Sequence, residues 1–269
     1  MAEYHFDFDD SPAYERAIGR WSRAVAPVFL QWLAPPVNAR WLDVGCGTGI
    51  LVHTLLELCS PAAVTGVDSA VAQVGQASRG PAGGRASFEV GDARSLPFRD
   101  ASFDIVTSAL VLNFIPEQQQ ALAEMRRVAR TGGTVAAYVW DFEEELSPSG
   151  PLRRAMRRFG LQVPPIPGTV ESRLEMLRAL FKEAGLERIE TRIIDVCLAY
   201  KDFDDFWKAQ TPSYVPTTKV IASMTESDRT RLMRAVRDQL PTAPEGVIEY
   251  FARANAIKAR VPRGVRARH

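Results

Sequence analysis

The chain has 269 residues, of which 46% are hydrophobic and 24% are charged, and its formal net charge at pH 7 is +1. These values are ordinary for a globular protein, and a net charge near zero argues against nucleic acid or an anionic membrane as a partner. The three cysteines form neither a disulfide framework nor a zinc pattern, and no uncharged run approaches the roughly twenty residues of a membrane span, so we expect a cytoplasmic protein without metal.

The first half of the chain alternates predicted helices and strands. Apolar residues recur at helical spacing over 13–33, and Pro35 and Pro36 end this helix. Further strands are expected at 40–44, 63–67, 86–90, 103–108 and 134–140, and further helices at 50–59, 69–79 and 116–130. Gly132 and Gly133 are expected to close the last of these helices. Because strands that alternate with helices form parallel βαβ units, the pattern predicts an α/β fold.

The second half is less regular and richer in proline. A proline-rich segment, 142–170, surrounds a short basic helix. The chain ends in a basic tail, which we expect to be solvated, as most such tails are; the alternative is a specific anionic partner. The remaining expected elements are helices at 171–184, 202–210 and 225–239 and strands at 187–197 and 250–261. The complete pattern predicts a doubly wound, mostly parallel seven-stranded sheet with helices on both faces, an N-terminal helical cap and a C-terminal helical elaboration.

The stretch WLDVGCGTGI, residues 41–50, is the most informative part of the sequence. Three glycines follow a strand and precede a helix, a place where a ligand can approach the backbone and the positive helix end. A dinucleotide turn would need glycine where Ile50 stands, and a P-loop would need a lysine. The pattern D-x-G-x-G-x-G resembles motif I of the class I S-adenosylmethionine-dependent methyltransferases. The resemblance assigns four residues to cofactor binding, namely Asp43, Gly45, Cys46 and Gly47.

Asp68 is a second candidate contact for this cofactor. It ends the second expected strand, nineteen residues after Gly49, close to the roughly twenty-residue offset at which a carboxylate binds a ribose diol in this topology. An ionised carboxylate offers acceptors for both hydroxyl groups. Asp68 and Ser69 are also common helix caps, and they can serve both purposes.

Asp92 and Ala93 follow the third expected strand. In the resembled class an acidic residue here accepts from the adenine amino group, and the next backbone N–H meets a ring nitrogen. The alternative for Asp92 is a simple turn residue.

The stretch from Gly91 to Asp141 is similar to the methyltransferase domain of the ubiquinone and menaquinone C-methyltransferases. By that resemblance Asn113 lies beside the methionine part of the cofactor; the alternative is helix entry ahead of Pro116. The preceding AYERAIGRWSR resembles the helix that covers the cofactor, which makes three residues candidates for the methionyl end: Tyr14, Arg20 and Trp21. Arg20 can grip a carboxylate through paired hydrogen bonds, whereas Trp21 can instead be a core residue.

The resemblance implies one methyltransferase domain over 1–269. We expect an N-terminal helical cap at 1–36, a cofactor-binding core at 37–141 and a lid and substrate-side elaboration at 142–245. A final strand at 246–262 and a basic tail at 263–269 follow. Lid candidates are 142–170 and an aromatic group that can equally be core: Phe203, Phe206, Trp207 and Tyr214.

The expected function is methyl transfer by in-line displacement to a small, partly apolar acceptor. The sequence names no catalytic base, since His53 is more simply a structural residue of the first core helix. The tetrad of amino-methylating DNA enzymes is missing, because Asn113-Phe114-Ile115-Pro116 stands in its place. The alternatives are a non-catalytic S-adenosylmethionine-binding sensor or partner protein and, less favoured by the glycine spacing, a nicotinamide-dependent oxidoreductase.

Overall fold

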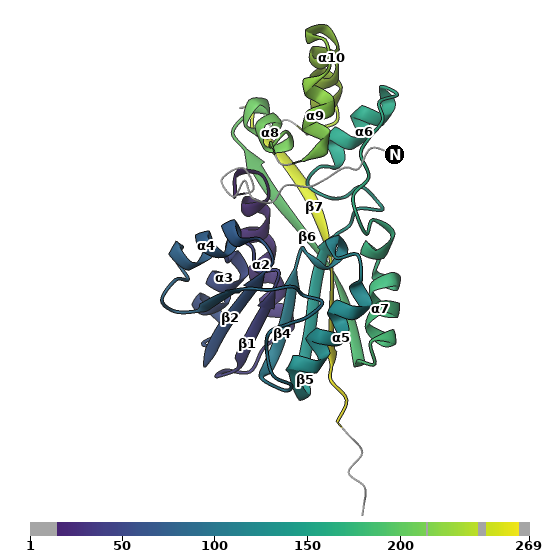
Figure 1. The fold of residues 1–269 in the computed structure, drawn as a ribbon. Coiled ribbons are helices and arrows are strands. Elements are labelled where there is room, and N and C mark those ends of the chain that lie inside the picture. The colour runs from purple at the N-terminus through teal and green to yellow at the C-terminus, as the bar shows by residue number, and fades with distance from the viewer. Residues whose placement is uncertain (1–14, 214, 242–245, 264–269) are drawn as a thin grey trace, which may run out of the picture.

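A seven-stranded sheet forms the centre of the protein (Figure 1). The computed structural model describes residues 15–213, 215–241 and 246–263. The strand order is β3-β2-β1-β4-β5-β7-β6, and β7 alone runs antiparallel to its neighbours. The strands are β1 (Arg40–Val44), β2 (Ala63–Asp68), β3 (Ser87–Val90), β4 (Phe103–Ala109), β5 (Ala129–Trp140), β6 (Glu187–Tyr200) and β7 (Ile248–Arg260). The predicted mostly parallel α/β fold is confirmed.

Helices cover both faces of this sheet (Figure 1). One face carries η1 (Glu15–Gly19), α2 (Arg20–Leu33), α3 (Ile50–Leu58) and α4 (Val71–Arg79), and the other carries α5 (Gln118–Val128) and α7 (Leu174–Glu183). Each helix turns an apolar stripe inward, as Trp21 and Phe29 do on α2 and Leu122 and Met125 do on α5, all of them fully buried. Two apolar cores therefore hold the sheet between them.

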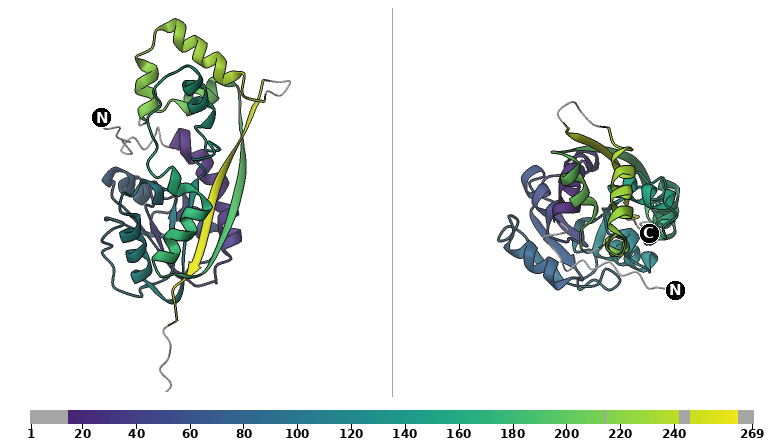
Figure 2. Two further views of the ribbon diagram at one scale, coloured as in Figure 1. Left: turned by 90° about the vertical axis from the view of Figure 1, so that its right-hand side faces the viewer. Right: turned by 90° about the horizontal axis from the view of Figure 1, so that it is seen from above.

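Strands β6 and β7 continue past the rest of the sheet. Pairing of β7 with β5 ends at Ala254, opposite Trp140, whereas pairing of β7 with β6 continues to Ile248 opposite Tyr200. The resulting two-stranded ribbon rises from the carboxyl ends of the parallel strands toward a separate group of helices (Figure 2). These helices are α6 (Gly150–Arg158), α8 (Phe203–Gln210), α9 (Pro216–Ala222) and α10 (Glu226–Arg237).

Two local expectations differ from the structure. Gly132 and Gly133 do not end a helix, because α5 stops at Val128 and β5 already begins at Ala129; Gly132 takes φ +74 within an irregular stretch of the strand. Helix α9 is missing from the predicted elements, although Pro216 in its first turn is a common helix start.

The expected lid region, 142–245, divides into two structural parts. Helix α7 packs on β6 and β7 and belongs to the sheet layers, while α6 and α8 to α10 form the layer above the carboxyl edge. None of the helices in the described ranges combines the length and the apolar character that crossing a bilayer requires. Over the same ranges, no group of three or more His, Cys, Asp and Glu side chains converges on a metal position.

Candidate functional site

The glycine turn lies between the end of β1 and the start of α3. Gly45, Gly47 and Gly49 all have positive φ, at +75, +52 and +84. A Cβ on Gly45 would lie 2.5 Å from Val111, whereas a Cβ on Gly47 would meet no atom within 4 Å. Helix α3 begins at the carboxyl end of β1, and no side chain among the described residues caps its first N–H groups. The turn therefore offers open backbone at Gly47 and a positive helix end beside it.

Asp43 lies beneath the turn and is almost completely buried, with 1% exposure. Thr107 donates a hydrogen bond of 3.0 Å to Oδ1, whereas Oδ2 has no partner among the described residues. Burial raises the pKa of Asp43 to about 7; the Thr107 hydrogen bond opposes the shift, and the charge of Asp68 adds to it. A positively charged ligand group at Oδ2 would satisfy this orphan oxygen.

Asp68 connects the end of β2 to the glycine turn. Its Oδ2 accepts the Gly47 N–H at 2.8 Å, and its Oδ1 accepts the Ala70 N–H at 2.9 Å at the entry to α4. Burial raises the pKa of Asp68, against hydrogen bonds from the backbone of Ala70, Gly47 and Ser69. Asp68 thus serves as a turn cap before α4 and also holds Gly47, while Ser69 is exposed in the same turn.

A small cavity of about 30 Å³ lies against the turn. Three of the sequence-predicted residues besides Asp43 line it, namely Gly45, Cys46 and Gly47. Burial raises the pKa of the Cys46 thiol, so Cys46 is a neutral wall residue. The other lining residues, which the sequence did not assign to the site, are Ser22, Thr48, Ile50, Leu51, Ala109 and Tyr138. Ala109 and Tyr138 are register partners on β4 and β5, a pairing that only the assembled sheet produces.

Glu15 of η1 reaches across to the turn. Its Oε1 accepts a hydrogen bond from Thr48, and its Oε2 accepts one of 2.8 Å from Arg23. This contact joins residues that are far apart in the sequence, and no local pattern around Glu15 signals it. Glu15 therefore covers the turn from the N-terminal side. Tyr14, the residue before it, lies outside the described residues.

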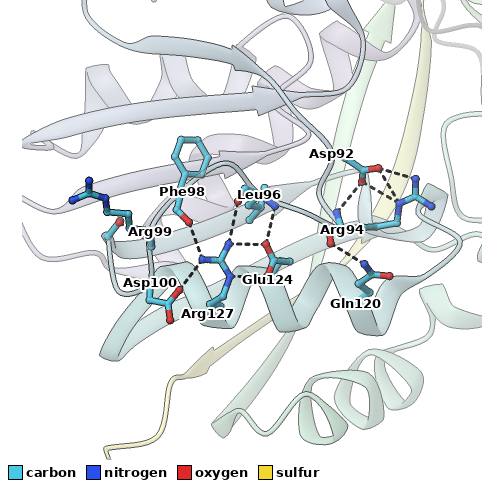
Figure 3. Close-up of polar contacts among 10 residues, drawn as sticks. Asp92, Arg94, Leu96, Phe98, Arg99, Asp100, Gln120, Glu124 and Arg127 are labelled. Atoms are coloured by element: carbon cyan, nitrogen blue, oxygen red, sulfur yellow. Dashed lines mark hydrogen bonds and ion pairs between the residues drawn. The ribbon is translucent and has the colours of Figure 1, made fainter.

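Asp92 lies at the same edge of the sheet, after β3, but outside the small cavity. Arg94 folds back onto the Asp92 carboxylate, with Nη2 to Oδ2 at 2.7 Å, and its backbone N–H donates to Oδ1 at 2.8 Å (Figure 3). These bonds from Arg94 lower the pKa of Asp92. Ala93 is half-buried in the same turn. Asp92 is thus an ionised, exposed acceptor whose charge Arg94 already partly neutralises.

The loop that carries Asp92 is fastened to α5. Arg127 donates to the carbonyl oxygens of Leu96 and Phe98 at 3.0 and 2.8 Å, and Glu124 accepts the Leu96 N–H at 2.8 Å (Figure 3). Gln120 adds a bond of 2.9 Å to the Arg94 carbonyl. This network fixes the rim of the site on the β3 side.

Asn113 lies in η2 (Leu112–Phe114), on the other side of the turn. Its Nδ2 donates to the Pro167 carbonyl at 3.1 Å, and its buried Oδ1 has no partner among the described residues. The amide therefore holds the segment before Gly168 against the loop that follows β4, and one acceptor remains for a ligand.

Two predicted cofactor contacts on α2 are directed elsewhere. Trp21 is fully buried, and its Nε1 donates to the Tyr200 hydroxyl at 3.0 Å, so its assignment to the cofactor is corrected to a core residue. The Arg20 guanidinium binds Asp205 at 3.1 Å and the Ala199 carbonyl at 2.9 Å. Because α2 packs on β6, these side chains face the ribbon and α8 rather than the glycine turn.

The remaining candidates also take definite places. His53 lies on α3 but does not line the cavity, and its buried Nδ1 has no partner among the described residues. Phe206 is fully buried in the core, where Phe203 and Trp207 pack against it, and Tyr214 lies outside the described residues. Among the described residues, the titratable side chains that line the cavity are Asp43, Cys46 and Tyr138.

The region that carries this site is similar to known methyltransferases. Residues 42–137 match a family described as a methyltransferase domain. The chain is 40% identical over 121 residues to a demethylmenaquinone methyltransferase of Roseiflexus castenholzii, covering 45% of this chain and 49% of that protein. It is 32% identical over 190 residues to 27-O-demethylrifamycin SV methyltransferase of Amycolatopsis mediterranei, covering 66% of this chain and 64% of that protein. The chain thus spans about half the length of the first two curated relatives it matches.

Solved structures share the fold at low identity. Phosphoethanolamine N-methyltransferase 2 of Haemonchus contortus, in complex with S-adenosyl-L-methionine, matches with a TM-score of 0.59 at 18% identity. The match covers 95% of this chain and 57% of that protein. At this identity the likeness shows the fold alone.

Proposed function

We propose that the chain is a class I S-adenosylmethionine-dependent methyltransferase that transfers a methyl group to a small-molecule acceptor, because residues 42–137 match a methyltransferase domain and the curated relatives include methyltransferases. One observation carries the proposal: the open backbone of Gly47 lies beside the orphan oxygen of Asp43 and is bonded to Asp68. This place is also the carboxyl end of β1, where the sheet order turns from β1 to β4, the usual ligand position in open α/β sheets.

The residues present fit the chemical groups of this cofactor. Oδ2 of Asp43 lacks a partner and suits the ammonium group, and the uncapped start of α3 suits the carboxylate. Asp68 has acceptor capacity for the ribose hydroxyl groups beyond its backbone hydrogen bonds. Asp92 and the backbone of Ala93 stand farther along the same edge for the adenine.

The protein's part in the reaction is binding, orientation and the exclusion of water. When bound, the cofactor would supply a methyl group on a sulfonium for in-line displacement, in which the bond from sulfur to methyl breaks and S-adenosylhomocysteine leaves. Holding the acceptor in line can contribute roughly 7–11 kcal/mol to lowering the barrier. Ala109, Tyr138 and Leu51 add apolar atoms to a lining that also includes Asp43.

Entry of the cofactor requires movement of the cover over the turn. A cavity of about 30 Å³ is too small for the whole cofactor, and the Glu15–Thr48 contact lies beside it, so we infer that this contact opens on binding. We assign this covering role to η1, and a substrate-side lid role to α6 and α8 to α10, which lie above the same edge.

Calorimetry with S-adenosylhomocysteine tests the cofactor assignment. We expect S-adenosylhomocysteine to bind saturably and NAD not to displace it. The absence of binding at about millimolar ligand, the weak end of specific affinities, would refute the proposal.

A second measurement separates the enzyme from a non-catalytic binder. Purified protein, S-adenosylmethionine and a panel of small acceptors are incubated, and formation of S-adenosylhomocysteine is followed. Turnover with any acceptor excludes the binder. Tight cofactor binding with no turnover across hydroxylated, amino and quinol acceptors would favour it.

A further inference from the structure

A second cavity lies above the carboxyl edge, between η1, α6, α8 and α9. Its volume is about 60 Å³, and most of its walls are apolar, from residues such as Ile18, Ile166 and Ala209. Arg153 is the one charged side chain among the described residues that line it. A buried charge in an apolar cavity is costly unless it is paired.

Arg153 has no acidic partner among the described residues. It is 8% exposed, and Nη2 donates to the Pro164 carbonyl at 2.8 Å. Burial lowers the pKa of Arg153 to about 10, which leaves the guanidinium protonated at neutral pH. Since a guanidinium has five N–H donors, most of its binding capacity is unused. Within the described residues, Arg153 is therefore a desolvated cation without a counter-ion.

Gln210 adds a second unsatisfied group to the same cavity. Its Nε2 donates to the Pro148 carbonyl at 2.9 Å, which fixes the orientation of the amide. The buried Oε1 then has no partner among the described residues. A ligand that meets both residues must present an anion to Arg153 and an O–H or N–H donor to Gln210.

The cavity adjoins the proposed donor site through two segments. In η1, Glu15 contacts the glycine turn, while Ala17 and Ile18 line the second cavity. On the other side, Ile166 lines the cavity, and Pro167 accepts the hydrogen bond from Asn113. The two cavities are thus linked through η1 and through residues 166–167.

We propose that this cavity binds the anionic group of the methyl acceptor, and that the acceptor is a small organic carboxylate with an O–H or N–H donor. The inference rests on the proposed function for its methyl-transfer part, whereas the carboxylate site stands on Arg153 and Gln210 themselves. A carboxylate pairs with guanidinium through two parallel hydrogen bonds, which gives orientation as well as affinity.

The test compares 4-hydroxybenzoate with uncharged 4-hydroxybenzamide by calorimetry on the full chain, with and without S-adenosylhomocysteine. We expect the carboxylate to bind about ten- to hundredfold more tightly, the scale of a hydrogen bond to a charged group. Arg153→Gln should remove this preference. Arg158→Gln, which removes an exposed charge from the same helix, should retain it.

Equal affinity for the two compounds, or no carboxylate binding at about 10 mM, would overturn the proposal. So would an unchanged preference in Arg153→Gln. Should that variant fail to fold, Gln210→Glu places a competing carboxylate in the same cavity and should likewise weaken 4-hydroxybenzoate binding. Wild type that binds the carboxylate but not S-adenosylhomocysteine would refute the proposed function and leave the anion site standing.

Discussion

The backbone N–H of Gly47 donates a hydrogen bond of 2.8 Å to Oδ2 of Asp68, which joins the turn after β1 to the end of β2. This bond sets the position of the open backbone and that of the proposed ribose acceptor relative to each other. A change at Asp68 should therefore act on cofactor binding in two ways, through a lost ligand contact and through a looser turn.

Asp68→Asn should weaken S-adenosylhomocysteine binding by about 1.5–3 kcal/mol, the usual scale of a hydrogen bond to a charged group. Calorimetry measures the affinity, and circular dichroism checks the fold. Asp104→Asn is the matched control, because Asp104 accepts the Arg40 N–H at 2.7 Å at the opposite edge of the sheet. Unchanged affinity in a folded Asp68→Asn protein would exclude the ribose role.

Asp43→Asn should stabilise the free protein at alkaline pH. The pKa of Asp43 is about 7 in the fold, against an ordinary value of 3.8, so the folded state binds more protons between these values. Wild-type stability then falls as pH rises from about 4 to 7, and the asparagine variant avoids this loss, on the order of 2–4 kcal/mol at pH 8. Denaturant unfolding at pH 5 and pH 8 measures the free energies of unfolding of the variant and of the wild type. If the two proteins differ by the same free energy at both pH values, the raised pKa of Asp43 is contradicted.

Binding of S-adenosylhomocysteine should strengthen as pH rises through about 7. The ligand's ammonium group favours the ionised form of Asp43, so binding releases a proton below that pH. Calorimetry in buffers of different ionisation enthalpy measures the released proton. In Asp43→Asn the affinity should be lower and this pH dependence should vanish; a retained dependence would point to another group.

Gly45→Ala and Gly47→Ala should separate structure from binding. Both residues have positive φ, which costs an alanine roughly 1–2 kcal/mol. At Gly45 the added methyl also meets Val111 at 2.5 Å, so that variant should lose about 1–3 kcal/mol more. Gly47→Ala should remain folded but bind S-adenosylhomocysteine more than tenfold more weakly, because its methyl enters the open space. Val111→Ala should restore part of the stability of Gly45→Ala and none of the binding lost in Gly47→Ala.

Arg20→Gln should leave S-adenosylhomocysteine affinity nearly unchanged. Its guanidinium binds Asp205, and both side chains are more than one-third exposed, so the pair contributes at most about 1 kcal/mol to stability. Thermal unfolding and calorimetry measure the two effects. A large loss of affinity without a loss of stability would return Arg20 to the cofactor site.

The sequence alone predicted the fold and the glycine turn beside Asp43. Strand and helix periods are local properties, and the spacing of glycines after Asp43 is a constraint on one turn. This is why β1 was predicted with its observed bounds and why Asp43, Gly45 and Gly47 meet at one cavity.

The tertiary structure decided which side chains face that turn. Trp21 and Arg20 lie on a helix whose apolar face could contact either a ligand or the protein core. In the structure α2 packs on β6, which directs both side chains away from the glycine turn. Glu15 and Thr48, Ala109 and Tyr138, and Arg153 and Gln210 are brought together by long-range contacts that leave no local pattern. Backbone geometry is encoded over a few residues, whereas the lining of a cavity depends on how distant elements pack.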